Sequence, residues 1–271
     1  MASAASILLT AGGTSSAVPQ RAARPSDGSL HNKVPQVTLA FWVMKICATT
    51  LGETGGDLLS MTMNVGYAAS TLILFGLFVV ALVSQLRAKA FHPFLYWAVI
   101  LATSTAGTTM SDYMDRTLGL GYVAGSAILI AALVAVLGIW RASVGTLSVE
   151  NIRTLKVEAF YWAAILVSNT LGTAFGDFLA DSSGLGFGGG ALLISGIIAL
   201  IALAYFYTKV SRTLLFWMAF VLTRPLGATA GDLLTKTHEK GGLGFGTIGS
   251  SLILAAVLVG VILYTSRRSP H

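Results

Sequence analysis

The sequence predicts an all-α integral membrane protein, in which eight transmembrane helices form four tandem, parallel two-helix repeats. The chain has 271 residues, of which 55% are hydrophobic and 10% are charged, whereas about a quarter of the residues of a soluble domain are charged. A four-fold internal repeat lies within its apolar segments. Eight apolar windows are long enough to cross a bilayer, at about residues 38–60, 66–86, 94–114, 121–140, 159–180, 187–208, 214–235 and 246–265.

Each repeat carries an aromatic–Trp pair, a glycine ten positions after the Trp and an Asp fifteen positions after it. The copies are Phe41-Trp42/Gly52/Asp57, Tyr96-Trp97/Gly107/Asp112, Tyr161-Trp162/Gly172/Asp177 and Phe216-Trp217/Gly227/Asp232. Because every copy contains two spans, all four enter the membrane in the same direction, related by an axis along the membrane normal. The predicted organisation is a disordered cytoplasmic tail (1–36), a transmembrane domain (37–266, with repeats at about 37–90, 91–155, 156–211 and 212–266) and a short cytoplasmic end (267–271).

The distribution of Lys and Arg predicts that both termini are cytoplasmic. One set of loops and ends holds Arg21, Arg24, Lys33, Arg87, Lys89, Arg141, Arg153, Lys156, Lys209, Arg212, Arg267 and Arg268. The other set holds Arg116, Lys236 and Lys240 among acidic residues, and the side richer in basic residues is the cytoplasmic one. We therefore expect a multi-pass protein of a bacterial inner membrane, surrounded by lipid bilayer, with no nucleic-acid partner despite a net charge of +6.

This orientation places the four Trp residues at the inner interface, as an aromatic belt. Each Asp lies about 22 Å further along its helix, in the outer part of a hydrocarbon core about 30 Å thick. A carboxyl group at that depth is costly and indicates a functional role. Small residues ten and fourteen positions after each Trp predict close helix packing on one face. The glycine–aromatic pairs beyond each Asp predict tight turns, at Gly66-Tyr67, Gly121-Tyr122, Gly186-Phe187 and Gly244-Phe245.

A second face of the same four helices carries polar residues that end at the repeated Asp. Its members are Thr50, Glu53, Thr54 and Asp57; Thr105, Thr108, Thr109 and Asp112; Thr170, Thr173 and Asp177; and Pro225, Thr229 and Asp232. Their offsets from the Trp share one side of a helix. Four hydroxyl stripes indicate a polar path through the bundle. The alternative is that the Thr side chains hydrogen-bond only their own helix backbone.

Further acidic residues lie one helical turn from the repeated Asp residues. They are Glu53, Asp115 and Asp181. Paired carboxylates at this spacing can share a hard cation, or can hold one proton between them. Asp115 and Asp181 can instead be solvated loop residues, whereas Glu53 lies deeper in the apolar segment.

Two basic residues interrupt the repeat. Arg224 lies near mid-membrane and needs an acidic partner, for which Glu53 and the repeated Asp residues are the candidates. Its counterparts in the other repeats form a polar layer at the same depth: Thr49, Ser104 and Asn169. Pro225 follows Arg224 and is expected to kink or break the helix. Lys45 is close enough to the inner interface to snorkel there, and we assign it no function.

The motifs of common enzyme sites are missing from the sequence. It has no GxxxxGK[ST] phosphate loop and no HExxH metal motif, its four His residues lie in the tail, in loops and at the end, and Cys47 is its single cysteine. A Cys-based zinc site or a disulfide framework is thus excluded. We predict that the protein is not an enzyme and binds no permanent cofactor.

The four-fold Gly-x-x-x-Gly/Ser-Asp pattern with cytoplasmic termini resembles a family of bacterial multi-pass proteins described as uncharacterised or membrane-anchored. The similarity covers residues 38–266 and implies no function. The segment Glu53-Thr-Gly-Gly-Asp57 is similar to the Glu-x-Gly-Asp motif of a family of calcium and manganese exporters. It differs by one extra Gly, by the absence of the basic and hydroxyl residues that follow, and by four copies rather than two. This second resemblance implies divalent cations and nothing more.

These observations predict a secondary transporter that exports cations, such as the divalent metal manganese, driven by a proton or by the membrane potential. The predicted cation and metal ligands are Asp57, Asp112, Asp177, Asp232 and Glu53, supported by Arg224, Thr50, Thr105, Thr108, Thr170, Thr173, Asn169, Asp115 and Asp181. A passive cation channel, a proton-coupled carrier of small organic solutes and a non-transporting structural membrane protein are the alternatives. The ion, the direction of transport and the oligomeric state stay open.

Overall fold

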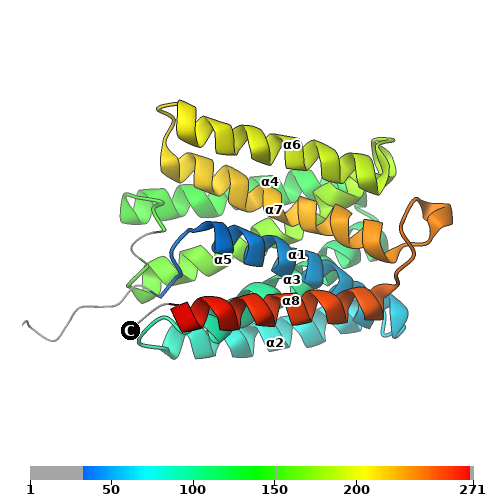
Figure 1. The fold of residues 1–271 in the computed structure, drawn as a ribbon, viewed down its shortest axis with the longest axis horizontal. Helices are drawn as coiled ribbons and strands as arrows, with labels where there is room; N and C mark the ends of the chain where they lie inside the picture. The colour runs from blue at the N-terminus through cyan, green and yellow to red at the C-terminus, as the bar shows by residue number, and fades with distance from the viewer. Residues whose placement is uncertain (1–32, 150–151, 269–271) are drawn as a thin grey trace, which may run out of the picture.

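The computed structural model describes residues 33–149 and 152–268, and within these ranges the regular structure is entirely helical. The eight α-helices are α1 (Leu39–Asp57), α2 (Tyr67–Arg87), α3 (Pro93–Asp112), α4 (Gly121–Val144), α5 (Leu155–Asp177), α6 (Gly186–Tyr207), α7 (Arg212–Thr235) and α8 (Thr247–Arg268). They run side by side along the longest axis of the molecule (Figure 1). Of the predicted tail, residues 1–32 lie outside the described residues, as do residues 269–271 of the predicted end.

Local signals in the sequence set where the helices begin. The side chains that cap α1, α3, α5 and α7 each accept a hydrogen bond from the amide three positions later, and they are Thr38, His92, Thr154 and Ser211. The predicted turns before the even-numbered helices are confirmed, because Gly66, Gly121, Gly186 and Gly244 all have positive φ, between 66° and 81°. Glycine adopts this conformation without the steric penalty of a Cβ atom.

The odd-numbered helices do not all end in the same way. The first three continue beyond their Asp into a π-helical turn, η1 (Leu58–Thr62), η2 (Tyr113–Thr117) and η3 (Phe178–Ser182). By contrast, α7 ends at Thr235 and is followed by an insertion that contains the short 3₁₀ turn η4 (His238–Lys240). Pro225 neither breaks nor ends α7, which is one continuous helix from residue 212 to residue 235.

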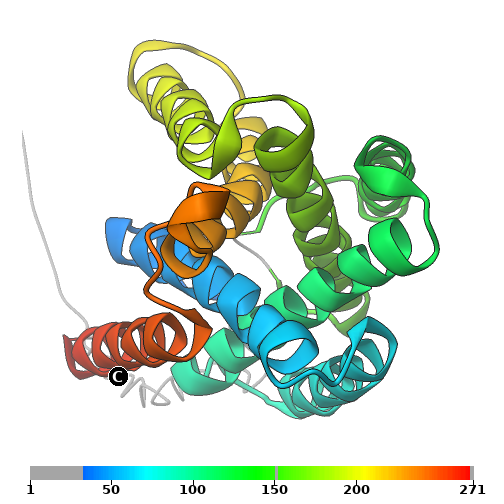
Figure 2. The same cartoon turned by 90° about the vertical axis from the view of Figure 1, so that its right-hand side faces the viewer.

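The helices form an inner ring and an outer layer. In the ring α1 packs on α3, α3 on α5, α5 on α7, and α7 on α1 again. The even-numbered helices lie outside this ring, as the end-on view in Figure 2 shows. Each odd-numbered helix is therefore enclosed by neighbours, and its inner face points toward the three other odd-numbered helices.

The two helices of one repeat are not each other's main packing partners, although the sequence predicts four two-helix repeats. Instead α2 packs on α3, α4 on α5, α6 on α7, and α8 on α1. Each outer helix thus covers the inner helix of the next repeat, and the last repeat covers the first. A single repeat cannot bury its own odd-numbered helix, so the four repeats form one cooperative unit.

Six helices are long and apolar enough to cross a membrane, namely α2, α4, α5 continued through η3, α6, α7 and α8. The other two, α1 and α3, carry more polar side chains and are buried at the centre. The outer helices expose large apolar side chains; for example, Leu72 and Leu192 are both 76% exposed. An apolar surface of this kind is typical of a protein that contacts another apolar medium, and these features are consistent with a multi-pass membrane protein.

The repeated aromatic pairs close one end of the inner ring. The prediction of an aromatic belt is wrong for three of the four Trp residues, because Trp97, Trp162 and Trp217 are 2%, 1% and 5% exposed. Their rings pack inside the bundle, where Trp162 contacts Tyr96 and Trp217 contacts Tyr161. The hydroxyl oxygens of Tyr96 and Tyr161 are 2.6 Å apart and share a hydrogen bond. These rings lie inside because the outer helix of the preceding repeat covers each of their helices.

Candidate functional site

The small residues of the inner ring set how closely its helices approach. The glycine ten positions after each Trp faces the side chain or backbone seven positions after the Trp of the next odd-numbered helix. The pairs are Gly52 with Ser104, Gly107 with Asn169, Gly172 with Arg224, and Gly227 with Thr49. A Cβ atom at any of these glycines would crowd that neighbour. The predicted packing face is thus confirmed, and it runs around the whole ring.

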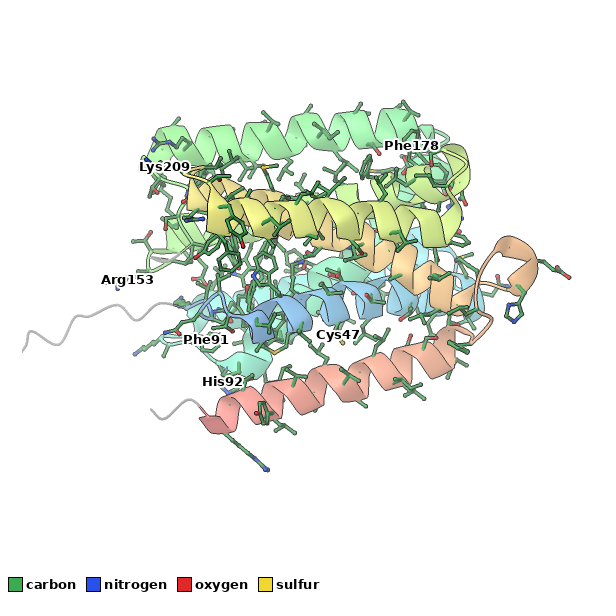
Figure 3. All side chains as sticks on the ribbon, turned by 45° about the horizontal axis from the view of Figure 1, so that its top comes forward. Cys47, Phe91, His92, Arg153, Phe178 and Lys209 are labelled. Atoms are coloured by element: carbon green, nitrogen blue, oxygen red, sulfur yellow. The ribbon has the colours of Figure 1, made fainter. Side chains whose placement is uncertain are left out.

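The four repeated Asp residues converge at the end of the ring opposite the aromatic pairs; we call them the aspartate ring. Lys236 joins two of them, with its Nζ 2.6 Å from Asp57 Oδ2 and 3.0 Å from Asp232 Oδ1. Arg116, one helical turn after Asp112, joins the other two, Asp112 and Asp177. Figure 3 places Phe178, the residue after Asp177, at the opposite end of the molecule from Arg153 and Lys209.

The second pair is joined by an arginine. Nε of Arg116 is 2.9 Å from Asp112 Oδ1, and its Nη2 is 3.0 Å from Asp177 Oδ2. Each repeated Asp residue is 4% exposed or less. The two pairs belong to one cluster, because Glu53, a close neighbour of Asp57 and Asp232, accepts hydrogen bonds from Thr108 and Thr173, which lie one turn before Asp112 and Asp177. Four repeats therefore contribute to one shared cluster rather than to four separate sites.

Glu53 lies one helical turn below the aspartate ring and pairs with Arg224. Oε2 of Glu53 is 2.9 Å from Arg224 Nη2. The Thr173 hydroxyl donates to Glu53 Oε2 at 3.3 Å and accepts from Arg224 at 2.7 Å, and Thr108 Oγ1 lies beside both groups in the same way. The partner predicted for Arg224 is thus confirmed as Glu53, with Thr108 and Thr173 around the pair.

Three of these carboxylates form a compact group that we call the acidic triad: Glu53, Asp57 and Asp232. One oxygen from each lies within 4.8 Å of the others, which is close enough for all three to ligate one metal ion. All three side chains are buried. Carboxylate oxygens are the ligands that hard divalent cations prefer.

The hydroxyl stripes divide between the two predicted roles. Thr50, Thr105 and Thr170 donate to carbonyl groups of their own helices, which is the backbone-bonding alternative. Only Thr108 and Thr173 reach the charged cluster. The reason is geometric, because successive helical positions differ by about 100°. The inner face follows offsets of 7, 11 and 15 from the Trp, whereas an offset of 8 points beside it.

The other two predicted carboxylates, Asp115 and Asp181, make their hydrogen bonds outside the aspartate ring. Asp115 is buried against Gly125 of α4 and accepts a hydrogen bond from Ser111. Asp181 is exposed and accepts from the Tyr122 hydroxyl at 3.2 Å.

Asn169 braces two helices of the ring rather than contacting the carboxylates. Its Nδ2 donates to Thr103 Oγ1 at 2.8 Å and to Ser104 Oγ at 3.3 Å, which connects α5 to α3. The predicted polar layer at this depth is therefore present, and it holds helices together one layer further from the aspartate ring than Glu53.

Sequence reasoning missed two cationic residues. Lys45 does not snorkel: it is fully buried, its Nζ lies 4.3 Å from the centre of the Phe220 ring, and this atom has no hydrogen-bond partner among the described residues. Arg116 was grouped with the loop charges, yet it ties the aspartate ring together. Its signal in the sequence is the spacing of four residues after Asp112, which matches that of Lys236 after Asp232.

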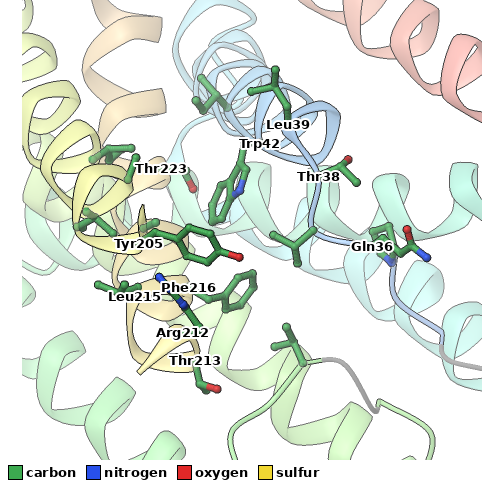
Figure 4. Close-up of a pocket in the computed structure, with 18 of the residues that line it drawn as sticks. Gln36, Thr38, Leu39, Trp42, Tyr205, Arg212, Thr213, Leu215, Phe216 and Thr223 are labelled. Carbon is green, nitrogen blue, oxygen red and sulfur yellow. The ribbon is translucent and has the colours of Figure 1, made fainter. Parts of the chain in front are cut away.

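A pocket of about 870 Å³ lies outside the ring, between α1, α6 and α7. Trp42, Tyr205, Arg212 and Phe216 line it (Figure 4). It adjoins the aromatic end of the bundle, so it is remote from the aspartate ring.

Comparison with known proteins identifies the repeat. The model of a family described as Repeat of Unknown Function (DUF347) matches the chain four times, at residues 40–91, 95–146, 160–211 and 215–269. No curated protein and no solved structure matches the chain. The similarity of residues 53–57 to a cation exporter motif therefore has no support from these comparisons.

Proposed function

Because the chain belongs to the Repeat of Unknown Function (DUF347) family, whose name assigns no activity, we propose a function from the site: a secondary transporter that exports a divalent cation such as manganese. The cation is bound by the acidic triad of Glu53, Asp57 and Asp232. The carboxylates of Asp112 and Asp177 complete the aspartate ring around it. All eight helices cross the membrane, with both termini in the cytoplasm and the aspartate ring toward the outer side.

The observation that carries this proposal is the convergence of buried carboxylates from all four repeats on one cluster. An acidic side chain within an apolar bundle is expensive, and structural needs alone are met more cheaply by apolar packing. Three ligand oxygens already lie within 4.8 Å of one another. A cation that loses its water shell can exchange it for these oxygens.

The charge of the cluster favours a divalent ion. Within the described residues, five carboxyl groups face three cationic side chains, those of Arg116, Arg224 and Lys236. Because metal ligation requires ionised carboxylates, a cluster that binds a cation carries an excess of negative charge in a buried region, and a divalent cation offsets more of that excess than a monovalent one. Arg224 acts as a fixed counter-ion, since its guanidinium is fully buried and held by Glu53 and two Thr hydroxyls.

The test is an export assay in cells. Cells that express the protein are exposed to a panel of divalent metals including manganese, and their metal content is measured by mass spectrometry. We expect lower content of one metal with wild type, and loss of this effect in Asp57→Asn and Asp232→Asn. Asp181→Asn is the matched control, because Asp181 is exposed and outside the ring.

A non-transporting structural role is favoured by one observation, the ion pairing of every member of the aspartate ring. In that case the carboxylates brace the helix ends, and no metal content changes in the export assay. A passive channel would dissipate gradients without accumulation against them. A proton-coupled carrier of organic solutes would leave metal content unchanged but acidify or alkalinise loaded vesicles when its solute is added.

A further inference from the structure

The two basic residues of the aspartate ring differ in how they are attached. Arg116 belongs to the π-helical turn η2, one turn beyond Asp112, and its planar guanidinium contacts the two carboxylates through different nitrogens. Its charge also lies 5.7 Å from the centre of the Tyr122 ring. A planar fork held on a continuous helix is a rigid brace.

Lys236 is attached to a loop instead. It is the first residue after α7, its backbone is extended (φ −69°, ψ 154°), and it opens the insertion that only the fourth repeat contains. Its ammonium is a compact charge on a flexible stem. The equivalent residues, nineteen positions after each Trp, are Met61, Arg116 and Asp181, so a mobile ammonium at this position is peculiar to the fourth repeat.

The insertion folds back on the end of α7. Its backbone bonds run there from Leu243 N to Leu233 O at 2.6 Å, from Gly244 N to Lys236 O at 2.9 Å and from Phe245 N to Leu234 O at 3.0 Å. Gly242 lies directly against the Lys236 backbone, where a side chain would collide. Most of residues 237–246 are exposed, and they project beyond the end of the helices next to α7 and α8 (Figure 1). These bonds hold the loop to the end of α7 and lie outside the inner ring, so a displacement of the Lys236 side chain leaves the packing of the ring intact.

Lys236 Nζ lies between two of the three carboxylates of the acidic triad. It contacts Asp57 Oδ2 and Asp232 Oδ1, two of the three triad carboxylates, while Glu53 is held from below by Arg224. The side chain of Lys236 is 19% exposed, so it reaches the cluster from the solvent side. An ammonium and a metal ion compete for the same oxygens, because each carboxylate lone pair can serve only one of them.

We propose that Lys236 is a tethered cation that occupies the acidic triad when no substrate is bound, and that leaves with its loop when a divalent cation enters. Arg116 stays in place and braces Asp112 and Asp177. This inference rests on the proposed cation transport and adds a gate to it. In the closed state, the ammonium group of Lys236 blocks the outer end of the cation site. Substrate binding then frees the loop, which couples occupancy of the site to opening of its outer end.

Titration calorimetry of the purified protein in detergent with Mn²⁺ tests the inference. We expect Lys236→Met to bind Mn²⁺ about tenfold more tightly than wild type, which is the factor that one charge-assisted hydrogen bond is worth. Lys236→Arg keeps the competing charge and should bind no more tightly than wild type. Lys240→Met, in the same loop but with an exposed side chain, is the matched control and should match wild type. Melting curves establish that each variant is folded.

The outcomes separate this inference from the proposed function. If wild type binds Mn²⁺ and Lys236→Met binds it no more tightly, the tethered cation is refuted while transport through the triad stands. If Lys240→Met tightens binding equally, the effect is one of general loop charge and the inference fails. If neither wild type nor Lys236→Met binds Mn²⁺ or any other divalent ion, the proposed cation site and its gate fail together.

Discussion

Replacing Glu53 with Gln tests whether the charged pair at the centre of the ring is as desolvated as its geometry indicates. Arg224 is fully buried, and Glu53 Oε2 lies 2.9 Å from its Nη2. Glu53→Gln keeps the shape of the side chain but leaves the guanidinium without its counter-charge. Removing one partner of a buried pair costs about 3–5 kcal/mol.

The remaining contacts of Arg224 place the expected loss at the low end of that range. Four oxygens still accept from its Nη atoms in the variant, those of Thr108, Thr173, Thr49 and Ser104. We therefore expect a loss of about 3 kcal/mol, which for a chain of this size lowers the melting temperature by about 6 °C. Differential scanning fluorimetry in detergent measures the shift.

A double variant isolates the physical cause. Glu53→Gln with Arg224→Met removes both charges, so no buried ion lacks a partner, and we expect it to melt at a higher temperature than Glu53→Gln alone. A melting temperature of Glu53→Gln within about 1 °C of wild type would refute the desolvated pair. A double variant less stable than the single one would show that the loss comes from packing rather than from uncompensated charge.

Three further predictions concern stability. Gly172→Leu should prevent α5 from packing on Arg224 and abolish folding, whereas Gly138→Leu, whose side chain meets open space, should melt like wild type. Equal melting temperatures of the two variants would refute the conclusion that Gly172 lies in a tightly packed helix contact. Lys45→Met should raise the melting temperature, because the Lys45 amine is buried without a hydrogen-bond partner among the described residues, and such burial costs about 1–3 kcal/mol. A lower melting temperature of the variant would show that the Lys45 amine stabilises the fold. Burial lowers the pKa of Lys236, but the carboxylates of Asp232 and Asp57 raise it by more in the folded state. The stabilisation that the Lys236 charge provides is therefore fully present below the unfolded-state pKa of about 10.4, and it is lost only as the pH rises through the higher folded-state pKa. The gap in melting temperature between wild type and Lys236→Gln should therefore stay constant from about pH 6 to pH 9, and a gap that closes within this range would contradict the assignment.

Several features of the site could be predicted because they depend on spacing along one helix. The small residues after each Trp identified the packing face, and the mid-membrane position of Arg224 required an acidic partner, which the structure identifies as Glu53. Errors arose where the outcome depended on a neighbouring helix. Lys45 is near a helix end, yet its helix is enclosed, so its amine is buried rather than interfacial.

The sequence by itself determined the helices, the four repeats and the position of one Asp in each. These are local properties, since helical periodicity, capping residues and turn glycines act within a few residues of chain. Only the tertiary structure decided that each outer helix covers the next repeat, that α8 closes the ring on α1, and that Lys236 and Arg116 divide the aspartate ring between them. The physical reason is that four nearly equivalent helices offer several ways to bury the same apolar and small-residue faces. The choice among them is made by contacts between residues up to 207 positions apart.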